Sequence, residues 1–206
     1  ASVAPKVGTF GRGRALWVRL SMAPHESPSS PEALIGKVLE QRYRVVRLLG
    51  EGGMGAVYEG LHIRLDKRVA IKVLHPHLAS DERQCKRFLR EARAANRIAS
   101  PHVVDILDFG EDPVTHFVME FLEGRDLKAV VRAAGPLPWP RARFIFLQIL
   151  RALAAAHDQG IVHRDVKPAN VFVLDGPDGR EFAKVLDFGI AKVRGPAAED
   201  GTLTGT

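Results

Sequence analysis

The sequence is poor in cysteine and has neither a long apolar run nor a strong excess of one charge. Cys85 is the only cysteine in 206 residues, which excludes an intramolecular disulfide and a multi-cysteine metal site and fits a reducing compartment. No apolar run approaches the roughly 18 residues that a membrane span requires, and no export signal is visible. We therefore expect a cytoplasmic protein with no membrane segment in this chain.

Charge and composition exclude two further classes of protein. The net charge is +6, but residues 1–42 contain six Lys or Arg against three Asp or Glu, so the remainder carries only +3. This excess is too small and too scattered to predict nucleic-acid binding. A hydrophobic fraction of 46% argues against a disordered chain, and the length fits one domain or two small ones.

The composition and the hydrophobic pattern of the sequence change at Tyr43. Residues 1–42 contain several glycines and the run Ser27-Pro28-Ser29-Ser30-Pro31 without a helical or strand period, and we predict a mostly disordered extension. Short runs rich in Val, Ile, Leu and Tyr follow, which is typical of strands. Antiparallel strands are expected at residues 43–49, 56–61 and 68–74, and two further strands at 103–109 and 116–121.

Helices are expected in the middle and later parts of the chain. Ser80 is the expected N-cap of a helix whose buried stripe includes Phe88, Ala92, Ala95 and Ala99. A polar break, Glu123-Gly124-Arg125, separates the expected strand at residues 116–121 from the later helices. Helices are predicted there at residues 126–134 and 139–157, the second closed by Gly160, and a hairpin follows with strands at 171–174 and 182–186.

A glycine-rich loop lies between the first two expected strands. Because Gly50, Gly52, Gly53 and Gly55 lack Cβ atoms, the backbone N–H groups of this loop can approach phosphate oxygens closely. A hairpin without any ligand explains such a pattern about equally well when it stands alone. Two other phosphate-binding motifs are excluded, because the chain has no GxxxxGK(S/T) sequence and because this loop joins strand to strand.

Lys72 is a candidate phosphate-binding residue. In the expected strand 68–74, alternation puts it on the face that carries Ala70 and Leu74, where a lysine is either solvated at an edge or paired. Glu91 lies beside the apolar stripe of the expected helix and is the expected partner, the alternative being a surface residue among arginines. A Lys72–Glu91 ion pair would aim the ammonium group at nucleotide phosphates.

The most specific segment is His163-Arg164-Asp165-Val166-Lys167-Pro168-Ala169-Asn170, read together with Asp187-Phe188-Gly189. Asn170 directly precedes the first strand of the expected hairpin and Asp187 directly follows the second, so antiparallel pairing brings both to the same end. Their amide and carboxylate oxygens suit Mg²⁺, which proteins usually hold with few groups of their own together with substrate phosphates.

Two further residues of this segment have expected roles in phosphoryl transfer. Asp165 could orient a hydroxyl nucleophile, and Lys167 could stabilise charge on the transferring phosphoryl group. A turn or cap role would explain any one of these polar residues alone, but it does not explain their joint order and placement.

Asp108-Phe109-Gly110 is a second Asp-Phe-Gly tripeptide. It precedes the His-Arg-Asp segment, and no Asn pairs with it across a hairpin. We therefore interpret Asp108 as part of a strand end that enters the turn at residues 111–113, without a metal-binding role.

The complete set of motifs resembles a Hanks-type protein kinase over Tyr43 to Thr206. The Gly-Gly-Met-Gly-x-Val-Tyr form at residues 52–58 resembles the bacterial branch of this family, and Lys167-Pro168 resembles kinases that act on Ser/Thr. The resemblance implies a two-lobed α+β fold, with an antiparallel sheet and one helix in the N-lobe and a mainly helical C-lobe. We expect an extension at 1–42, the N-lobe with hinge at 43–123 and an incomplete C-lobe at 124–206.

The resemblance also implies an ATP site with Mg²⁺ and assigns residues to it. In this assignment, Met119 guards the back of the adenine pocket, Glu120 and Leu122 offer hinge backbone groups, Val57 and Ala70 pack on the ring, and Asp126 lies near the ribose. Lys72, Glu91, Asp165 and Lys167 are the implied catalytic residues, Asn170 and Asp187 the implied metal ligands, and Gly50, Gly52, Gly53 and Gly55 the phosphate-covering loop. The expected reaction transfers the γ-phosphoryl group of ATP to Ser/Thr hydroxyls of protein substrates.

Two alternatives stay open at this stage. One is a non-catalytic nucleotide-binding or scaffolding relative, which would usually have lost Lys72, Asp165 or Asp187. Another is a small-molecule phosphotransferase of related fold, which rarely has the complete set of motifs. The sequence departs from the family at its end, because it stops at Thr206 before an Ala-Pro-Glu motif, and this leaves open whether this chain itself folds, binds substrate or is active.

The resemblance also implies a control site in the last residues. Thr202 and Thr204 follow Asp187 in a polar loop, where another copy of the kinase could phosphorylate them through self-association. In family members with an arginine at the position of Arg164, such a phosphate pairs with that arginine. Thr206 resembles instead a structural threonine that contacts the catalytic Asp and Lys.

Overall fold

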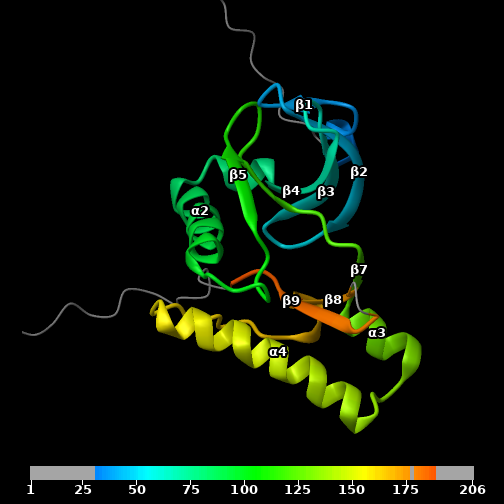
Figure 1. The fold of residues 1–206 in the computed structure, drawn as a ribbon. Helices are drawn as coiled ribbons and strands as arrows, with labels where there is room; N and C mark the ends of the chain where they lie inside the picture. Colours follow the sequence, from blue (N-terminus) through cyan, green and yellow to red (C-terminus); the bar gives the residue numbers. More distant parts are fainter. Residues whose placement is uncertain (1–30, 177–178, 189–206) are drawn as a thin grey trace, which may run out of the picture.

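The computed structural model describes residues 31–176 and 179–188, which form two lobes (Figure 1). The first lobe, residues 31–120, is built on a six-stranded antiparallel sheet with the strand order β1-β2-β3-β4-β6-β5. Its strands are β1 (Val38–Leu39), β2 (Tyr43–Glu51), β3 (Gly55–His62), β4 (Lys67–Leu74), β5 (Ile106–Gly110) and β6 (His116–Glu120). Its helices are η1 (Pro31–Leu34), α1 (Pro76–Ala79) and α2 (Glu82–Arg97).

Strand β4 is buried on both faces of the sheet, as the alternation in the sequence predicts. Val69 and Ile71 pack with Tyr58 of β3 in one core cluster. On the opposite face, Ala70 and Leu74 pack in a second cluster that contains Phe88 of α2. The face that carries Lys72 is therefore the face that α2 covers.

The start of α2 differs from the prediction by one residue. Asp81, not Ser80, is the N-cap, because its backbone is extended and its carboxylate accepts a hydrogen bond from the backbone N–H of Arg83 at 2.8 Å. Ser80 has helical backbone angles and instead closes α1. Phe88, Ala92 and Ala95 of the predicted stripe are buried, but Ala99 is exposed because α2 ends at Arg97.

Residues 31–42 correct the prediction of a disordered extension. They form η1 and β1, and Leu34 and Leu39 are buried against the β2–β4 side of the sheet. The Tyr58 hydroxyl donates a hydrogen bond to the backbone oxygen of Pro31 at 2.8 Å. These apolar contacts are made with distant strands, so the local composition gave no sign of them. Residues 1–30 lie outside the described part of the chain.

The second lobe, residues 124–176 and 179–188, lies below the first in Figure 1. Its elements are β7 (Gly124–Asp126), α3 (Leu127–Ala134), α4 (Trp139–Asp158), η2 (Pro168–Asn170), β8 (Val171–Asp175) and β9 (Glu181–Val185). The predicted polar break is in fact strand β7, which pairs with β8. A Cβ at Gly124 would lie 2.3 Å from the backbone oxygen of Val173, so glycine permits this close pairing.

The two lobes are joined by residues 121–123 and by contacts of the loop before β5. Val185 of β9 donates a backbone hydrogen bond to His102 at 2.8 Å, and Val104 donates one back to Val185 at 3.2 Å. Lys184 of β9 also forms an ion pair with Glu120 at the end of β6. Within the described residues, no helix is both long and apolar enough to cross a membrane.

Candidate active site

Lys72 and Glu91 form the predicted ion pair. Strand β4 presents Lys72 to α2, and the inner face of α2 presents Glu91, so that Lys72 Nζ lies 2.6 Å from Glu91 Oε1. Only 8% of Lys72 and 6% of Glu91 is exposed, which excludes the alternative of two solvated surface residues. The ion pair is therefore confirmed, and it ties α2 to the centre of the sheet.

Lys72 also contacts the second lobe, which the sequence did not predict. Its Nζ lies 2.8 Å from Oδ1 of Asp187, a residue that follows β9. One ammonium group therefore holds a carboxylate from α2 and a carboxylate from the other lobe. The sequence contains no local signal for this contact, because the two residues are 115 positions apart.

The three charges shift one another's ionisation. Burial alone would lower the pKa of Lys72, but the carboxylates of Asp187 and Glu91 outweigh this and raise that pKa to about 12. Burial raises the pKa of Glu91 to about 7 against the opposing effect of the Lys72 ammonium. Burial also favours the neutral form of Asp187, yet the same ammonium holds the pKa of Asp187 below its ordinary value. Lys72 is consequently charged at neutral pH.

The β8–β9 hairpin brings Asn170 and Asp187 to one end, as its antiparallel topology predicts. Val171 pairs with Val185, and the backbone N–H of Leu186 donates to the oxygen of Asn170 at 2.8 Å. No group of three or more His, Cys, Asp or Glu in the described chain is arranged to hold a metal by itself. One amide and one carboxylate suit a cation that is shared with phosphate oxygens.

Asp165, Lys167 and Asn170 converge beside this hairpin end. Lys167 Nζ lies 2.8 Å from Asp165 Oδ2, and the Asn170 amide donates to the backbone oxygen of Asp165 at 3.0 Å. Asn170 is buried, whereas Lys167 is exposed. Asn170 ends the short 3-10 helix η2, and Lys167 directly precedes that helix.

His163 holds this loop against the Asp187 segment, a role that sequence reasoning missed. Its Nδ1 accepts from the backbone N–H of Asp165 at 3.2 Å, so Nε2 carries the proton that is donated to the Leu186 oxygen at 2.9 Å. The ring packs on Phe188 with centroids 4.6 Å apart. Burial lowers the pKa of His163, which favours this neutral form.

Two residues of the site have left-handed backbone conformations. Arg164 has φ +60° and Asp187 has φ +49°, values that cost non-glycine residues free energy. Such strain persists where surrounding contacts fix the chain, and here the hydrogen bonds of His163 join the two segments. The loop that carries Asp165 and the segment that carries Asp187 are thus held as one unit.

The glycine loop closes the β2–β3 hairpin above the lobe junction. The backbone N–H of Gly52 donates to the oxygen of Gly55 at 2.9 Å. A Cβ at Gly50 or Gly53 would meet nothing within 4 Å, whereas a Cβ at Gly55 would lie 2.0 Å from the backbone oxygen of Val73. Gly55 is therefore required by the packing of β3 on β4, and the other two leave space for a ligand.

The residues predicted to surround adenine lie in one region. Ala70 and Met119 belong to the core cluster on the α2 side of the sheet, and Val57 packs against it. Glu120 ends β6, where its side chain accepts from the backbone N–H of Asp105 at 2.8 Å. Leu122 follows in the connection between the lobes.

Asp126 and Asp108 are each held by contacts within the protein. The Asp126 carboxylate caps α3 by accepting from the N–H of Ala129 at 2.8 Å. Asp108, in the second Asp-Phe-Gly, lies in β5 and accepts from the Tyr43 hydroxyl at 2.8 Å. It is part of a strand end, as predicted, and its carboxylate also pairs with Arg42.

One cavity lies away from the predicted site, and four residues with predicted roles lie outside the described part of the chain. A cavity of about 510 Å³ opens beside η1 and α1, and none of the predicted site residues lines it. Gly189, Thr202, Thr204 and Thr206 fall outside the described residues, so the structure does not bear on their predicted roles.

Comparison of the sequence with known families matches residues 43–206 to the protein kinase domain. Serine/threonine-protein kinase pkn3 of Myxococcus xanthus is 44% identical over 172 residues, which cover 82% of this chain and 31% of pkn3. PrkC of Bacillus subtilis, also a serine/threonine-protein kinase, is 45% identical over 159 residues, which cover 77% of this chain and 24% of PrkC. The chain therefore spans about a third or less of these curated relatives.

Solved structures show the same fold. A crystal structure of the Mycobacterium tuberculosis PknI kinase domain superposes with a TM-score of 0.64 at 35% identity, covering 76% of this chain and 61% of that chain. A structure of Rad53 residues 1–466 in complex with AMP-PNP gives a TM-score of 0.62 at 28% identity, over 72% of this chain and 38% of that chain. Both the sequence match and the two-lobed fold lead to one conclusion: this chain belongs to the protein kinase domain family.

Proposed function

We propose that the protein is an ATP-dependent serine/threonine kinase that phosphorylates other proteins in the cytoplasm. The observation that carries this proposal is Lys72, whose ammonium contacts Glu91 at 2.6 Å and Asp187 at 2.8 Å and so links the two lobes at one point. The 44% identity to a serine/threonine-protein kinase supports the same reaction. A non-catalytic relative would usually have lost Lys72, Asp165 or Asp187, and all three are present.

ATP is the proposed phosphoryl donor. Its adenine would lie against Val57, Ala70 and Met119, and its phosphates would lie under the glycine loop, where Gly50 and Gly53 leave open space. The Lys72 ammonium would attract the phosphates. The AMP-PNP bound to the related Rad53 is a nucleotide of the corresponding class.

Mg²⁺ is the proposed metal, held by Asn170 and Asp187. The donor set of one amide and one carboxylate fits Mg²⁺, which prefers oxygen ligands and retains phosphate and water ligands. When bound, the metal would supply positive charge next to the phosphates. Asp187 contributes a carboxylate whose pKa is held below its ordinary value, so it is ionised and ready to bind a cation at neutral pH.

Asp165 and Lys167 are the proposed groups for the transfer step. The Asp165 carboxylate would accept a hydrogen bond from the substrate hydroxyl and hold its oxygen toward the phosphorus atom. Lys167, 2.8 Å from that carboxylate, would stabilise negative charge on the transferring group. His163 and Asn170 keep the Asp165 loop in place through their hydrogen bonds.

The test is the substitution Asp165→Asn in the full-length protein. The carboxylate positions the acceptor and does not hold ATP, so we expect turnover to fall by about 10²–10⁴ while ATP affinity changes little. Turnover is followed by transfer of labelled phosphate to a protein acceptor, and affinity by calorimetry with Mg-ATP. Unchanged turnover would contradict the role of Asp165.

The two Asp-Phe-Gly tripeptides supply a matched control for the metal site. Asp187→Asn should weaken Mg²⁺-dependent nucleotide binding, whereas Asp108→Asn should leave it unchanged because Asp108 binds Tyr43 and Arg42 instead. If Asp108→Asn proved the more damaging change for nucleotide binding, the assignment from the hairpin would be wrong.

Phosphorylation of Thr202 and Thr204 by a second copy belongs to the same proposal. Arg164 is exposed next to Asp165 and is the proposed partner of the phosphate. Mass spectrometry after incubation with Mg-ATP should find phosphate on Thr202 or Thr204. An active preparation with neither site modified would remove this part of the proposal.

A further inference from the structure

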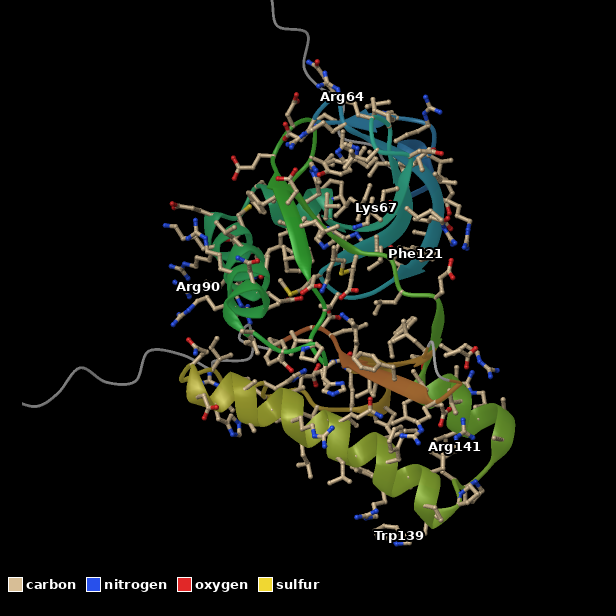
Figure 2. The ribbon with its side chains drawn as sticks, in the orientation of Figure 1. Arg64, Lys67, Arg90, Phe121, Trp139 and Arg141 are labelled. Carbon is tan, nitrogen blue, oxygen red and sulfur yellow. The ribbon has the colours of Figure 1, made fainter. Side chains whose placement is uncertain are left out.

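A row of basic side chains runs along the outer face of α2. The helix contains six Lys or Arg against two Glu, and one of those glutamates, Glu91, is buried. Five of the basic residues are exposed, and at about 100° per residue they fall within about 80° of one another around the helix. They are Arg83, Lys86, Arg90, Arg93 and Arg97, which we call the α2 basic row. Figure 2 shows Arg90 pointing away from the body of the protein.

This arrangement opposes the stability of the helix. Lys86 with Arg90 and Arg93 with Arg97 are like charges four residues apart, a spacing at which they repel. The helix dipole favours Arg97 in the last turn but disfavours Arg83 in the first turn. Lys86 has a partner, Glu82, at 2.6 Å, but the described residues provide no ion pair for the arginines of the row. The folding of α2 therefore does not explain the row.

Among the described residues, the excess of positive charge lies on this helix. Apart from α2, the described residues contain 18 Lys or Arg and 18 Asp or Glu, so their formal charges cancel. The row is one side chain wide and, from position 83 to position 97, about 21 Å long at about 1.5 Å per residue. A row of Lys and Arg along a helix is also the pattern of nucleic-acid and lipid-headgroup binding, but those partners would extend beyond the row onto described residues whose formal charges cancel. A narrow row on a neutral surface instead fits a single acidic chain segment.

The position of the row points to the protein substrate as the source of that segment. The inner face of α2 holds Glu91 against Lys72, so an acidic segment on the outer face would lie about one helix diameter from the ion pair that is proposed to face the ATP phosphates. Tethering a substrate there would raise the effective concentration of its hydroxyl group at Asp165. A Ser or Thr hydroxyl alone offers the enzyme little to recognise.

We propose that the α2 basic row is a docking surface for an acidic segment of the protein substrate. This inference rests on the proposed kinase function for the identity of the partner, but the binding itself requires neither ATP nor catalysis. An extended segment of about seven residues, at about 3.3 Å per residue, would span the row.

Binding is tested with the full-length protein and a fluorescein-labelled oligoglutamate peptide of about eight residues, followed by anisotropy without nucleotide. The variant Arg90→Gln/Arg93→Gln removes two charges from the row and keeps residues of good helix propensity. The control Arg64→Gln/Lys67→Gln removes the same charge from the exposed β3–β4 turn. Figure 2 labels Arg64, Lys67 and Arg90.

We expect the row variant to raise the dissociation constant of the peptide about fivefold, and the control variant to leave it unchanged. Added salt should weaken binding to the unaltered protein, because the contacts are exposed. Equal affinities of the two variants would overturn the proposal. Tighter, row-dependent binding of duplex DNA, or of vesicles of phosphatidylcholine and phosphatidylglycerol, would also overturn it in favour of that partner.

A kinase assay separates this inference from the proposed function. Two acceptor peptides are compared, identical except that one carries an acidic segment. We expect Arg90→Gln/Arg93→Gln to raise KM for the acidic peptide without changing kcat, and to leave the other peptide unaffected. Phosphorylation that does not depend on the acidic segment would refute docking but not the kinase activity. A complete lack of phosphate transfer by the unaltered protein would refute the kinase activity, while peptide binding by the row would still be measured.

Discussion

Helices α2 and α4 each lie against a sheet, but their outer faces are opposite in character. The exposed residues of α2 are mainly charged, and its apolar residues, such as Phe88, are buried. Helix α4 buries Ile145, Ile149 and Ala152 against the second lobe, yet it exposes large apolar residues as well. These are Trp139, Phe144, Phe146, Leu147 and Leu150, and Figure 2 shows Trp139 at the lower end of α4, on the outside.

The difference shows when a hydrophobic pattern predicts the buried face of a helix and when it predicts only the helix. In α2 the apolar residues fall on one stripe because the only large apolar partner is the sheet, so the sequence predicts both the helix and its buried face. In α4 apolar residues occur on both sides, so the sequence predicts a helix but not its orientation. Among the described residues nothing covers the outer side of α4. Packing against its described neighbours therefore explains the inner apolar residues of this helix but not the outer ones.

The largest expected effect compares a phenylalanine from each helix. Phe88 is 0% exposed and packs on Phe117 with ring centroids 4.8 Å apart, so Phe88→Ala should lower the free energy of unfolding by about 3–5 kcal/mol. Phe146 is 58% exposed, and Phe146→Ala should change it by no more than about 0.5 kcal/mol. Urea unfolding followed by circular dichroism measures both. Equal losses would mean that the outer face of α4 is covered.

The second expected effect compares the ion pair that anchors each helix. Lys72→Met and Glu91→Gln should each lower phosphoryl transfer, and their coupling energy should be about 0.5–3 kcal/mol because both act through one buried contact. The pair of Arg141 and Glu181, which joins α4 to β9 at 2.6 and 2.9 Å, is the control and should not alter transfer. Double-mutant cycles on kcat/KM provide the measurement, and simple additivity for Lys72 and Glu91 would show that they act independently.

The third expected effect concerns the contact between the lobes. The Glu120 carboxylate accepts from the Asp105 N–H and pairs with Lys184, so Lys184→Met should loosen this connection at a cost of roughly 1 kcal/mol. Hydrogen exchange should become faster at the amides of Val104 and Asp105 and stay unchanged in the centre of β4. Faster exchange throughout β4 would instead indicate a general loss of stability.

The smallest expected effect is the part of the pH dependence that comes from one buried histidine in each lobe. Burial lowers the pKa of His116 in the first lobe and of His163 in the second, relative to an unfolded value near 6.5. Below that pH the unfolded imidazoles bind more protons than the folded ones, so these two histidines should lower stability as the pH falls. Glu91, whose pKa is raised to about 7, opposes this slope because the folded chain binds its proton first. His116→Leu should remove part of this slope, and the exposed His77→Gln should not. A slope unchanged by His116→Leu would contradict the burial argument.

The sequence predicts most of what depends on local periodicity and on hairpin topology. The strands around Lys72, helix α2 with Glu91, and the approach of Asn170 to Asp187 were all predicted, because each follows from alternation, helical spacing or antiparallel pairing. For the same reason the second Asp-Phe-Gly could be set aside, since Asp108 has no partner strand that returns to an asparagine.

Contacts between distant segments were not predictable in this way. Strand β7 consists of Gly124, Arg125 and Asp126, residues with low strand propensity, and it exists because β8 pairs with it. Residues 31–42 are ordered because Leu34 and Leu39 reach a core built by other strands. The second contact of Lys72, with Asp187, depends on how the two lobes meet, and no periodicity encodes that.

The packing of Gly55 on β4 affects how related sequences should be classified. A Cβ there would lie 2.0 Å from the Val73 oxygen, so selection for an intact sheet retains this glycine whether or not a nucleotide binds. Gly50 and Gly53 have no such constraint, because a side chain at either would point into open space. In a survey of homologues, a glycine at the position of Gly55 would therefore be a marker of the fold. Under the proposed function, in which these two glycines cover the ATP phosphates, substitution at the positions of Gly50 and Gly53 would be the earlier sign that a lineage no longer binds a nucleotide.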